Sequence, residues 1–209
     1  MDLGRAVAQT KDGGYIVAGY TKFRGAGNTY AWLVRVDPQG RELWNRIYRS
    51  KGAEEATSVQ EAPDGGFIVA DHTDSLGAGE KDLWLLETDS EGKEEWSQGL
   101  WRQRGRSCLV CSPGLGRRLH CYRGYHSPLL VPGPSEAWLV KVGSQGRNEW
   151  DRTFGTSTEG SARAVVQTRD GGYAVAGYSR AAYSDDPLTV DNPKGHILLA
   201  KFGINGTLE

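Results

Sequence analysis

Asp12-Gly-Gly-Tyr-Ile-Val-Ala-Gly-Tyr20 decides the fold, because the chain repeats it from Asp64 (DGGFIVADH) and from Asp170 (DGGYAVAGY). A glycine pair after an acidic residue is a strong hairpin signal, since glycine supplies the positive φ that tight turns need. The run that follows is apolar and rich in β-formers, as expected for a strand that is covered on both faces. The stretch therefore predicts a repeated β-hairpin.

A second motif follows each copy at a constant distance: AWLVRVDPQGRELW ends at Trp44, DLWLLETDSEGKEEW at Trp96 and AWLVKVGSQGRNEW at Trp150. Trp44 and Trp96 are 52 residues apart, and Trp96 and Trp150 are 54 residues apart. The Asp64 and Asp170 motifs are 106 residues apart, which is two periods with one glycine pair missing between them. In the last copy, we expect Ile197 of ILLAKF to replace the tryptophan found earlier as Trp32, Trp84 and Trp138.

Each copy is expected to form four short strands, which in the first copy are 6–10, 15–20, 32–36 and 42–48. A period near 52 with four strands per unit falls in the range of propeller repeats and outside that of helical solenoids. One such sheet cannot bury both faces alone, so neighbouring sheets must stack. The sequence predicts an all-β fold, a β-propeller of about four four-stranded blades in a partial or open ring, as a single region 1–209. The expected blades span 2–50, 53–100, 101–154 and 158–209.

The positions that recur in every copy are expected to be structural. The aromatic ones would fill the layers between blades, each contributing about 2–3 kcal/mol on burial, and are core residues rather than a ligand cage. The predicted structural positions are Asp12, Gly13, Gly14, Asp64, Gly65, Gly66, Asp170, Gly171, Gly172, Trp32, Trp84, Trp138, Trp44, Trp96 and Trp150.

Composition and chain ends narrow the function classes. The net charge of −1 over 209 residues gives no sign of a nucleic-acid partner. No stretch of 18 apolar residues occurs, which excludes a membrane-spanning helix from this chain, and the first residues already read as a strand rather than a signal peptide. The sequence stops where a fourth strand is due, so we expect a fragment of a larger propeller.

Residues 97–135 break the pattern. They contain six arginines, four prolines and all three cysteines, but no Asp, Glu or Lys. Two interpretations of their chemistry arise: a basic patch, and a zinc site, because the segment combines Cys108-x-x-Cys111 with His120, Cys121 and His126.

A shift of reading frame explains this segment better. In the other copies the motif aspartate lies 20 residues after the tryptophan, which places the missing motif at Gly116–Cys121 (GRRLHC). Codons for Asp-Gly-Gly-Tyr-Ile-Val, read one base early, permit all six of these residues. We therefore interpret about 35–40 residues as translated out of frame, irregular and exposed, with the cysteine and arginine clusters as by-products. Outside them the chain has 19 basic and 26 acidic residues, so the repeat surface is acidic.

The motif TxDGGYIVAGYT…DAWLVKVDxxGxxxW resembles a repeat of large secreted or surface-anchored β-propeller proteins of bacteria and archaea; it covers 2–96 and 135–209. The spacing Asp37-x-x-Gly40-x-x-x-Trp44, repeated from Asp89, is similar to the tryptophan-docking motif of quinoprotein propellers, although Gly143 replaces the aspartate in the third copy. Kelch repeats are less similar, because their glycine pair ends the second strand. The resemblance implies an extracellular or cell-surface scaffold or binding surface.

The uniform copies favour a non-catalytic binding or scaffolding module without a cofactor. Specificity in such a protein is expected on loops at one face, here 22–30, 73–81 and 179–195, with a protein or carbohydrate as the partner. The last of these loops carries Asp185, Asp186 and Asp191, for which an unconstrained acidic loop is the preferred interpretation and a Ca²⁺ site the alternative.

Two alternatives remain open. An enzyme, either a quinone-dependent dehydrogenase or a polysaccharide-active propeller, requires converging carboxylates or metal ligands. The first place to look is Asp71-His72, which replaces Gly-Tyr of the repeat; His196 and the Asn205-Gly-Thr sequon carry less weight. The other alternative is a broken gene product without independent function.

Overall fold

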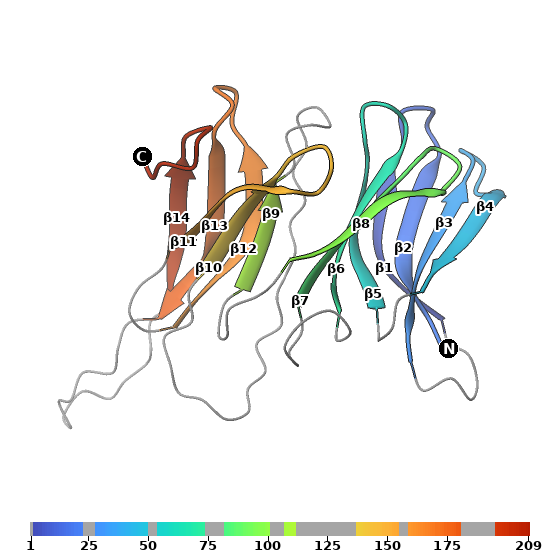
Figure 1. The fold of residues 1–209 in the computed structure, drawn as a ribbon, viewed down its shortest axis with the longest axis horizontal. Coiled ribbons are helices and arrows are strands. Elements are labelled where there is room, and N and C mark those ends of the chain that lie inside the picture. The colour runs from blue at the N-terminus through green and yellow to red at the C-terminus, as the bar shows by residue number, and fades with distance from the viewer. Residues whose placement is uncertain are drawn as a thin grey trace. The chain divides into compact units, whose positions relative to one another are not determined.

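A computed structural model describes residues 2–22, 28–49, 54–73, 82–100, 107–111, 137–154, 159–180 and 195–209. These residues form strands and turns, and no helix occurs among them (Figure 1). The prediction of an all-β chain is therefore confirmed. The chain divides into two compact units: Met1–Arg102 with Pro113–Gly116 and Gly143–Arg147, and Gln103–Ser112 with Arg117–Val142 and Asn148–Glu209.

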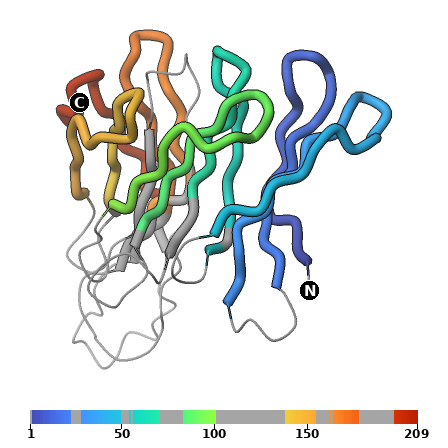
Figure 2. The backbone as a smooth tube through the Cα atoms, turned by 45° about the vertical axis from the view of Figure 1, so that its right-hand side comes forward, coloured from blue at the N-terminus to red at the C-terminus, as the bar shows by residue number. Residues whose placement is uncertain are grey.

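The first unit contains two four-stranded antiparallel sheets. In each of them the strands are neighbours in chain order, so the chain runs up and down without a crossover. One sheet consists of β1 (Asp2–Gln9), β2 (Tyr15–Thr21), β3 (Tyr30–Val36) and β4 (Glu42–Tyr48); the other of β5 (Glu54–Glu61), β6 (Phe67–Thr73), β7 (Asp82–Thr88) and β8 (Glu94–Leu100). The β1–β2 and β3–β4 turns lie at the same end of their sheet (Figure 2).

The second unit contains two three-stranded sheets. One has the order β11–β10–β9 and consists of β9 (Ser107–Cys111), β10 (Ala137–Val142) and β11 (Asn148–Phe154). The other consists of β12 (Glu159–Gln167), β13 (Tyr173–Arg180) and β14 (Gly195–Phe202), in chain order. None of the four sheets is closed, and each lies within one of the four residue ranges expected from the repeat.

The sheets share their irregularities as well as their strand order. The first and second strands shift register between Gly4 and Ala6, and again at the two equivalent places, Ala56/Ser58 and Ala162/Ala164. The third and fourth strands shift at Arg35/Val36, Glu87/Thr88 and Lys141/Val142. Because a bulge is a specific two-against-one pairing, the aligned segments share this local pairing geometry as well as their sequence pattern.

The register corrects one expectation about the last copy. Trp32 lies opposite Gly19, and Leu198 lies opposite the equivalent Gly177, whereas Ile197 lies opposite Tyr178. Leu198, and not Ile197, therefore occupies the tryptophan position. The apolar run ILLAKF does not alternate, so its pattern leaves the register open by one residue, and the pairing with β13 fixes it.

Apolar side chains from facing sheets form the core of the first unit. Its cluster combines Ile16, Ala18, Ala31, Leu33 and Tyr48 of the first sheet with residues of the second sheet, namely Ala56, Val59, Phe67, Val69, Trp84 and Leu86. A smaller cluster in the second unit joins Leu139 and Phe154 to residues of the last sheet, among them Val165, Tyr173, Val175 and Phe202. The sheets thus bury their faces by stacking, as the repeat argument required.

The segment 97–135 differs in part from the irregular stretch that was expected. β8 continues to Leu100, and Ser107–Cys111 form a strand that pairs parallel with β10. The apolar core of that pentapeptide, Cys108-Leu-Val-Cys111, suits a strand, which is the physical reason for the difference. Residues 101–106 and 112–136 lie outside the described part of the chain.

Candidate functional site

The glycine-pair turns have one design in all three described copies. Gly13 N donates to Thr10 O at 2.9 Å, and Thr10 N donates to Gly14 O at 2.9 Å; the turns from Ala62 and Thr168 repeat both bonds. The aspartate side chain caps the turn, because Asp12 Oδ1 accepts hydrogen bonds from Gly14 N and from Thr10 Oγ1. The first glycine has φ values of 87°, 93° and 86° in the three copies, which confirms the predicted reason for a glycine there.

The second glycine is required for a different reason. A Cβ on Gly14 would collide with the carbonyl oxygen of Val36, the last residue of β3. Gly66 meets the carbonyl of Thr88 and Gly172 that of Phe202 in the same way. Backbone, unlike a flexible side chain, cannot move aside, so any side chain here would separate the turn from the third strand.

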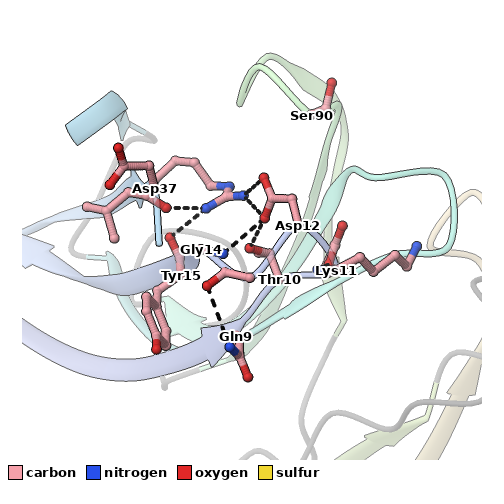
Figure 3. A network of polar contacts seen from close by, with 12 residues as sticks. Gln9, Thr10, Lys11, Asp12, Gly14, Tyr15, Asp37 and Ser90 are labelled. Atoms are coloured by element: carbon pink, nitrogen blue, oxygen red, sulfur yellow. Dashed lines mark hydrogen bonds and ion pairs between the residues drawn. The ribbon is translucent and has the colours of Figure 1, made fainter. Parts of the chain in front are cut away.

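A basic residue of the third strand holds the aspartate in two copies. Arg35 is only 6% exposed, and its Nη2 lies 2.6 Å from both carboxylate oxygens of Asp12, while its Nη1 donates to Tyr15 O and Val36 O (Figure 3). The hydrogen bonds from Thr10 and Gly14, together with Arg35, lower the pKa of Asp12 to about 2. Lys201 Nζ lies 2.8 Å from Asp170 in the last sheet, and lowers the pKa of that carboxyl in the same way.

Glu87 departs from this pattern in the second sheet. It pairs with Ile68 and Trp96, just as Arg35 pairs with Ile16 and Trp44, so it holds the position of the basic residue. Its side chain is 3% exposed, and the nearby Asp64 and Glu95 are also acidic. Burial, opposed by a hydrogen bond from Trp96 and reinforced by these two carboxylates, raises the pKa of Glu87 to about 7.

The turns between the third and fourth strands also share one backbone. Gly40 N donates to Asp37 O, and Asp37 N donates to Arg41 O. The same two backbone hydrogen bonds recur in the turns that begin at Asp89, Gly143 and Gly203. Asp37 Oδ1 accepts from Gln39 N and Arg41 N, and Asp89 repeats this cap. The turn keeps the same backbone hydrogen bonds where Gly143 and Gly203 replace the aspartate, so the aspartate supports the turn but does not define it.

A tryptophan from the fourth strand of one copy docks on this turn of the next copy. Trp44 Nε1 donates to Ser90 O at 3.1 Å, and Trp150 Nε1 donates to Ile204 O at 3.1 Å. Trp96 Nε1 donates to Ser144 O at 3.0 Å. Ser144 lies in the turn 143–147, which belongs to the first compact unit. The ring edges also contact the aromatic residue after the glycine pair: Trp44 and Phe67 have centroids 5.7 Å apart, and Trp150 and Tyr173 5.5 Å.

The glycine of each docking turn makes room for the indole. Gly92, Gly146 and Gly206 have φ between 68° and 76°, and a Cβ on any of them would fall within 3.0 Å of Trp44, Trp96 or Trp150 respectively. Gly40 has the same backbone, with a φ of 79°, but nothing lies within 4 Å of its Cβ position. Among the residues that the structure describes, the docking geometry is therefore present in four turns, and an indole occupies three of them.

The residues with the most evident chemistry in the sequence are not brought together in the described structure. Asp185, Asp186 and Asp191 lie outside the described residues, as do His120, Cys121 and His126. Cys108 and Cys111 lie on β9, and Asp71 and His72 lie opposite Trp84 and Leu83 on β7; His196 lies opposite Ser179. Asn205 Oδ1 accepts a hydrogen bond from Thr207 Oγ1 within its turn. No group of three metal-ligating side chains occurs among the described residues.

The sequence pattern singles out the glycines and tryptophans of this end of the sheets but not Glu87. The signal was present, because Glu87 aligns with Arg35, Lys141 and Lys201, and only the last three can pair with an acid. In the part of the chain that the structure describes, no helix is long and apolar enough to cross a membrane. Neither the protein-family models nor the curated proteins give a match to the chain.

Proposed function

We propose that the chain is a non-catalytic β-propeller scaffold or binding module of the secreted or cell-surface type, whose four sheets are blades and which forms part of a larger propeller. The observation that carries the proposal is the repeated tryptophan dock. Three indoles donate the same hydrogen bond, to a carbonyl 46 to 54 residues further along the chain, and make the same contact with the turn glycine. Such nearest-neighbour contacts are what hold a repeat array together.

The uniformity of the turn end supports a scaffold rather than an enzyme. Its polar groups are used within the sheets: Asp12 is held by Arg35, Asp170 by Lys201, and the turn carbonyls by Trp44 and its equivalents. This end therefore supplies stability, and the variable loops between second and third strands at the other end of each sheet supply the binding surface. A protein or carbohydrate of the cell envelope is the expected partner.

A loop exchange tests this assignment. Replacing 23–27 and 74–80 by Gly-Ser segments of equal length should abolish binding to an immobilised panel of envelope polysaccharides and surface proteins, while the melting temperature stays within about 2 °C of the unmodified chain. The matched control replaces Pro38-Gln39 by Ala-Ser in an exposed turn at the opposite end. Loss of binding in the control but not in the loop variant would contradict the proposal, and so would a chain that binds no member of the panel.

A further inference from the structure

Two sheet faces of the chain expose apolar residues that their counterparts bury. On the first sheet, the Val7 face consists of Val7, Tyr15, Val17, Trp32 and Val34, which the register places on one side. On the last sheet, the Ile197 face consists of Ala164, Val166, Ala174, Ala176, Ile197 and Leu199. Val7 is 66% and Tyr15 39% exposed; Ile197 is 89% and Leu199 74% exposed.

The equivalents of the Val7 face show what covers such a surface. Val59 and Val165 hold the position of Val7 in the later sheets, and they are 7% and 2% exposed. Phe67 and Tyr173 hold the position of Tyr15, and they are 2% and 1% exposed. In the first unit, Val59 and Phe67 belong to one buried cluster with Ile16, Ala18, Ala31 and Leu33 of the first sheet. On the second sheet, the equivalent of the Val7 face is thus buried by the face of the first sheet that carries these four residues.

The Ile197 face of the last sheet corresponds to the face of the first sheet that carries Ile16 and Leu33. The register makes Ala174 and Ala176 the equivalents of Ile16 and Ala18, and Ile197 and Leu199 those of Ala31 and Leu33. Ala31 and Leu33 are 0% exposed where a second sheet covers them. The chain therefore exposes both halves of an interface that it also forms internally, one on its first sheet and the other on its last.

A polar contact of the internal interface has its counterpart as well. Lys11, beside the motif aspartate, donates from Nζ to Ala62 O at 2.9 Å and to Pro63 O at 2.7 Å of the next sheet. Arg169 holds the position of Lys11 in the last sheet and is exposed, and Thr10 and Lys11 hold the positions of Ala62 and Pro63. A cation and two backbone acceptors are thus available at the corresponding place.

We infer that the chain associates with a second copy of itself head to tail, with the Ile197 face of one molecule on the Val7 face of the next. The two faces differ, so the contact is heterologous, and either a closed ring or an open chain of molecules results. The described last sheet has three strands and no docking tryptophan, so this contact is smaller than the internal one and exchanges readily. The inference rests on the proposed function and deepens it, because the further blades of the larger propeller are then supplied by other copies of this chain.

Two blocked variants test the inference on the full chain. By sedimentation equilibrium, the unmodified protein should show a weight-average mass above one chain that increases with concentration. Val7→Glu and Ile197→Glu each bury a charge in one half of the contact, so each alone should remain a monomer. Mixed in equal amounts, with a tag on one, they should form a 1:1 dimer and nothing larger, because each still carries the face that the other lacks. Leu43→Glu, at an exposed apolar residue of neither face, should associate like the unmodified chain.

The outcomes separate the alternatives. A single chain mass at all concentrations up to about 1 mM, where even millimolar contacts are populated, overturns the inference. Association of either single variant alone also overturns it, since a two-fold contact between identical faces would then be present. Tyr15→Glu and Leu199→Glu provide a second pair, and thermal unfolding of every variant checks that a monomer is folded.

Discussion

Glu87 is an acidic residue at the position where the other three sheets have a basic residue. An acid whose pKa is raised in the folded protein, here to about 7, binds its proton more tightly folded than unfolded. Its contribution to stability is complete below pH 4.5 and is lost as the pH rises towards 7. The Glu87→Gln variant should therefore be more stable than the unmodified chain at pH 8, on the order of 2 kcal/mol, and equally stable at pH 5 within about 0.5 kcal/mol.

Urea unfolding at the two pH values measures this difference. Glu95→Gln is the matched control, because Glu95 is an exposed neighbour on β8 whose removal should change stability little at either pH. An equal effect of Glu87→Gln at pH 5 and pH 8 would show that the residue acts through packing and not through its charge.

Arg35 and Lys201 hold equivalent positions but are predicted to differ in importance. Arg35 is buried and donates to the two backbone carbonyls of Tyr15 and Val36 as well as to Asp12, whereas the side chain of Lys201 is 44% exposed. Arg35→Met removes a buried guanidinium that donates to two part-buried carbonyls and to Asp12, so it should lower the free energy of unfolding by about 1–3 kcal/mol. Lys201→Met should cost less than about 1 kcal/mol.

Chemical denaturation of both variants at pH 7 provides the comparison, and a pH series extends it. The lowered pKa of Asp12 means that its contribution is present above pH 4 and is lost as the pH falls towards 2. The Arg35→Met variant should therefore lose less stability than the unmodified chain between pH 4 and pH 2. Equal losses in the two proteins would argue against the ion pair.

The glycines show how far the structural role of a single residue could be predicted from the sequence. A glycine at positive φ was expected in each of these turns, because a local turn rule demands it, and the structure shows it at the first glycine of each pair. The second glycine is required because the carbonyl oxygen of a residue 22 to 30 positions further along the chain lies where its Cβ would be. No local rule describes that contact. Glu87 illustrates the same limit, since its raised pKa depends on burial that a sequence pattern does not give.

At the scale of an element, the docking turn offers a comparison between two glycines with the same backbone. Gly40 and Gly92 both have positive φ, but only Gly92 lies against an indole, that of Trp44. Gly40→Ala should cost about 1 kcal/mol, the strain of the left-handed conformation. Gly92→Ala should cost that strain and, in addition, about 1–3 kcal/mol for displacing Trp44 from its dock.

Equilibrium unfolding with tryptophan fluorescence reports both quantities, because a displaced indole also shifts its emission to longer wavelength. The Gly92→Ala variant should show such a shift and Gly40→Ala should not. Equal destabilisation of the two variants would mean that the dock contributes nothing beyond the turn itself.

The strands were predicted better than their pairing. Hairpins joined by short turns are fixed locally, so β1 to β4 lie where glycine pairs and apolar runs indicated. The register of β14 was one residue off, because a run of apolar residues such as Ile197–Ala200 does not alternate, and a slip by one residue reverses the faces. β9 was not expected at all, since parallel pairing with β10 depends on a partner distant in sequence.

At the scale of the whole molecule, the third sheet is the exception to the repeat. Its neighbours pair their second and third strands antiparallel, with a glycine-pair turn before the second strand. Here the place beside β10 is taken by β9, which is five residues long and runs parallel. Parallel pairing is somewhat weaker per residue, and one short strand replaces two. The out-of-frame interpretation of 97–135 accounts for this difference without any special property of the third sheet.

Restoring the frame tests that interpretation at the level of gene and protein. The +1 frame across codons 97–135 should encode an Asp-Gly-Gly strand pair, and the corrected chain should lose all three cysteines and regain an antiparallel partner for β10. Two added antiparallel strands bury more apolar surface, so the melting temperature should increase, by about 2–4 °C for each kcal/mol gained. Calorimetry of the two proteins gives the comparison, and a silent recoding of the same stretch is the control. A +1 frame without the motif, or a corrected chain that melts lower, would show instead that β9 is the native partner of β10.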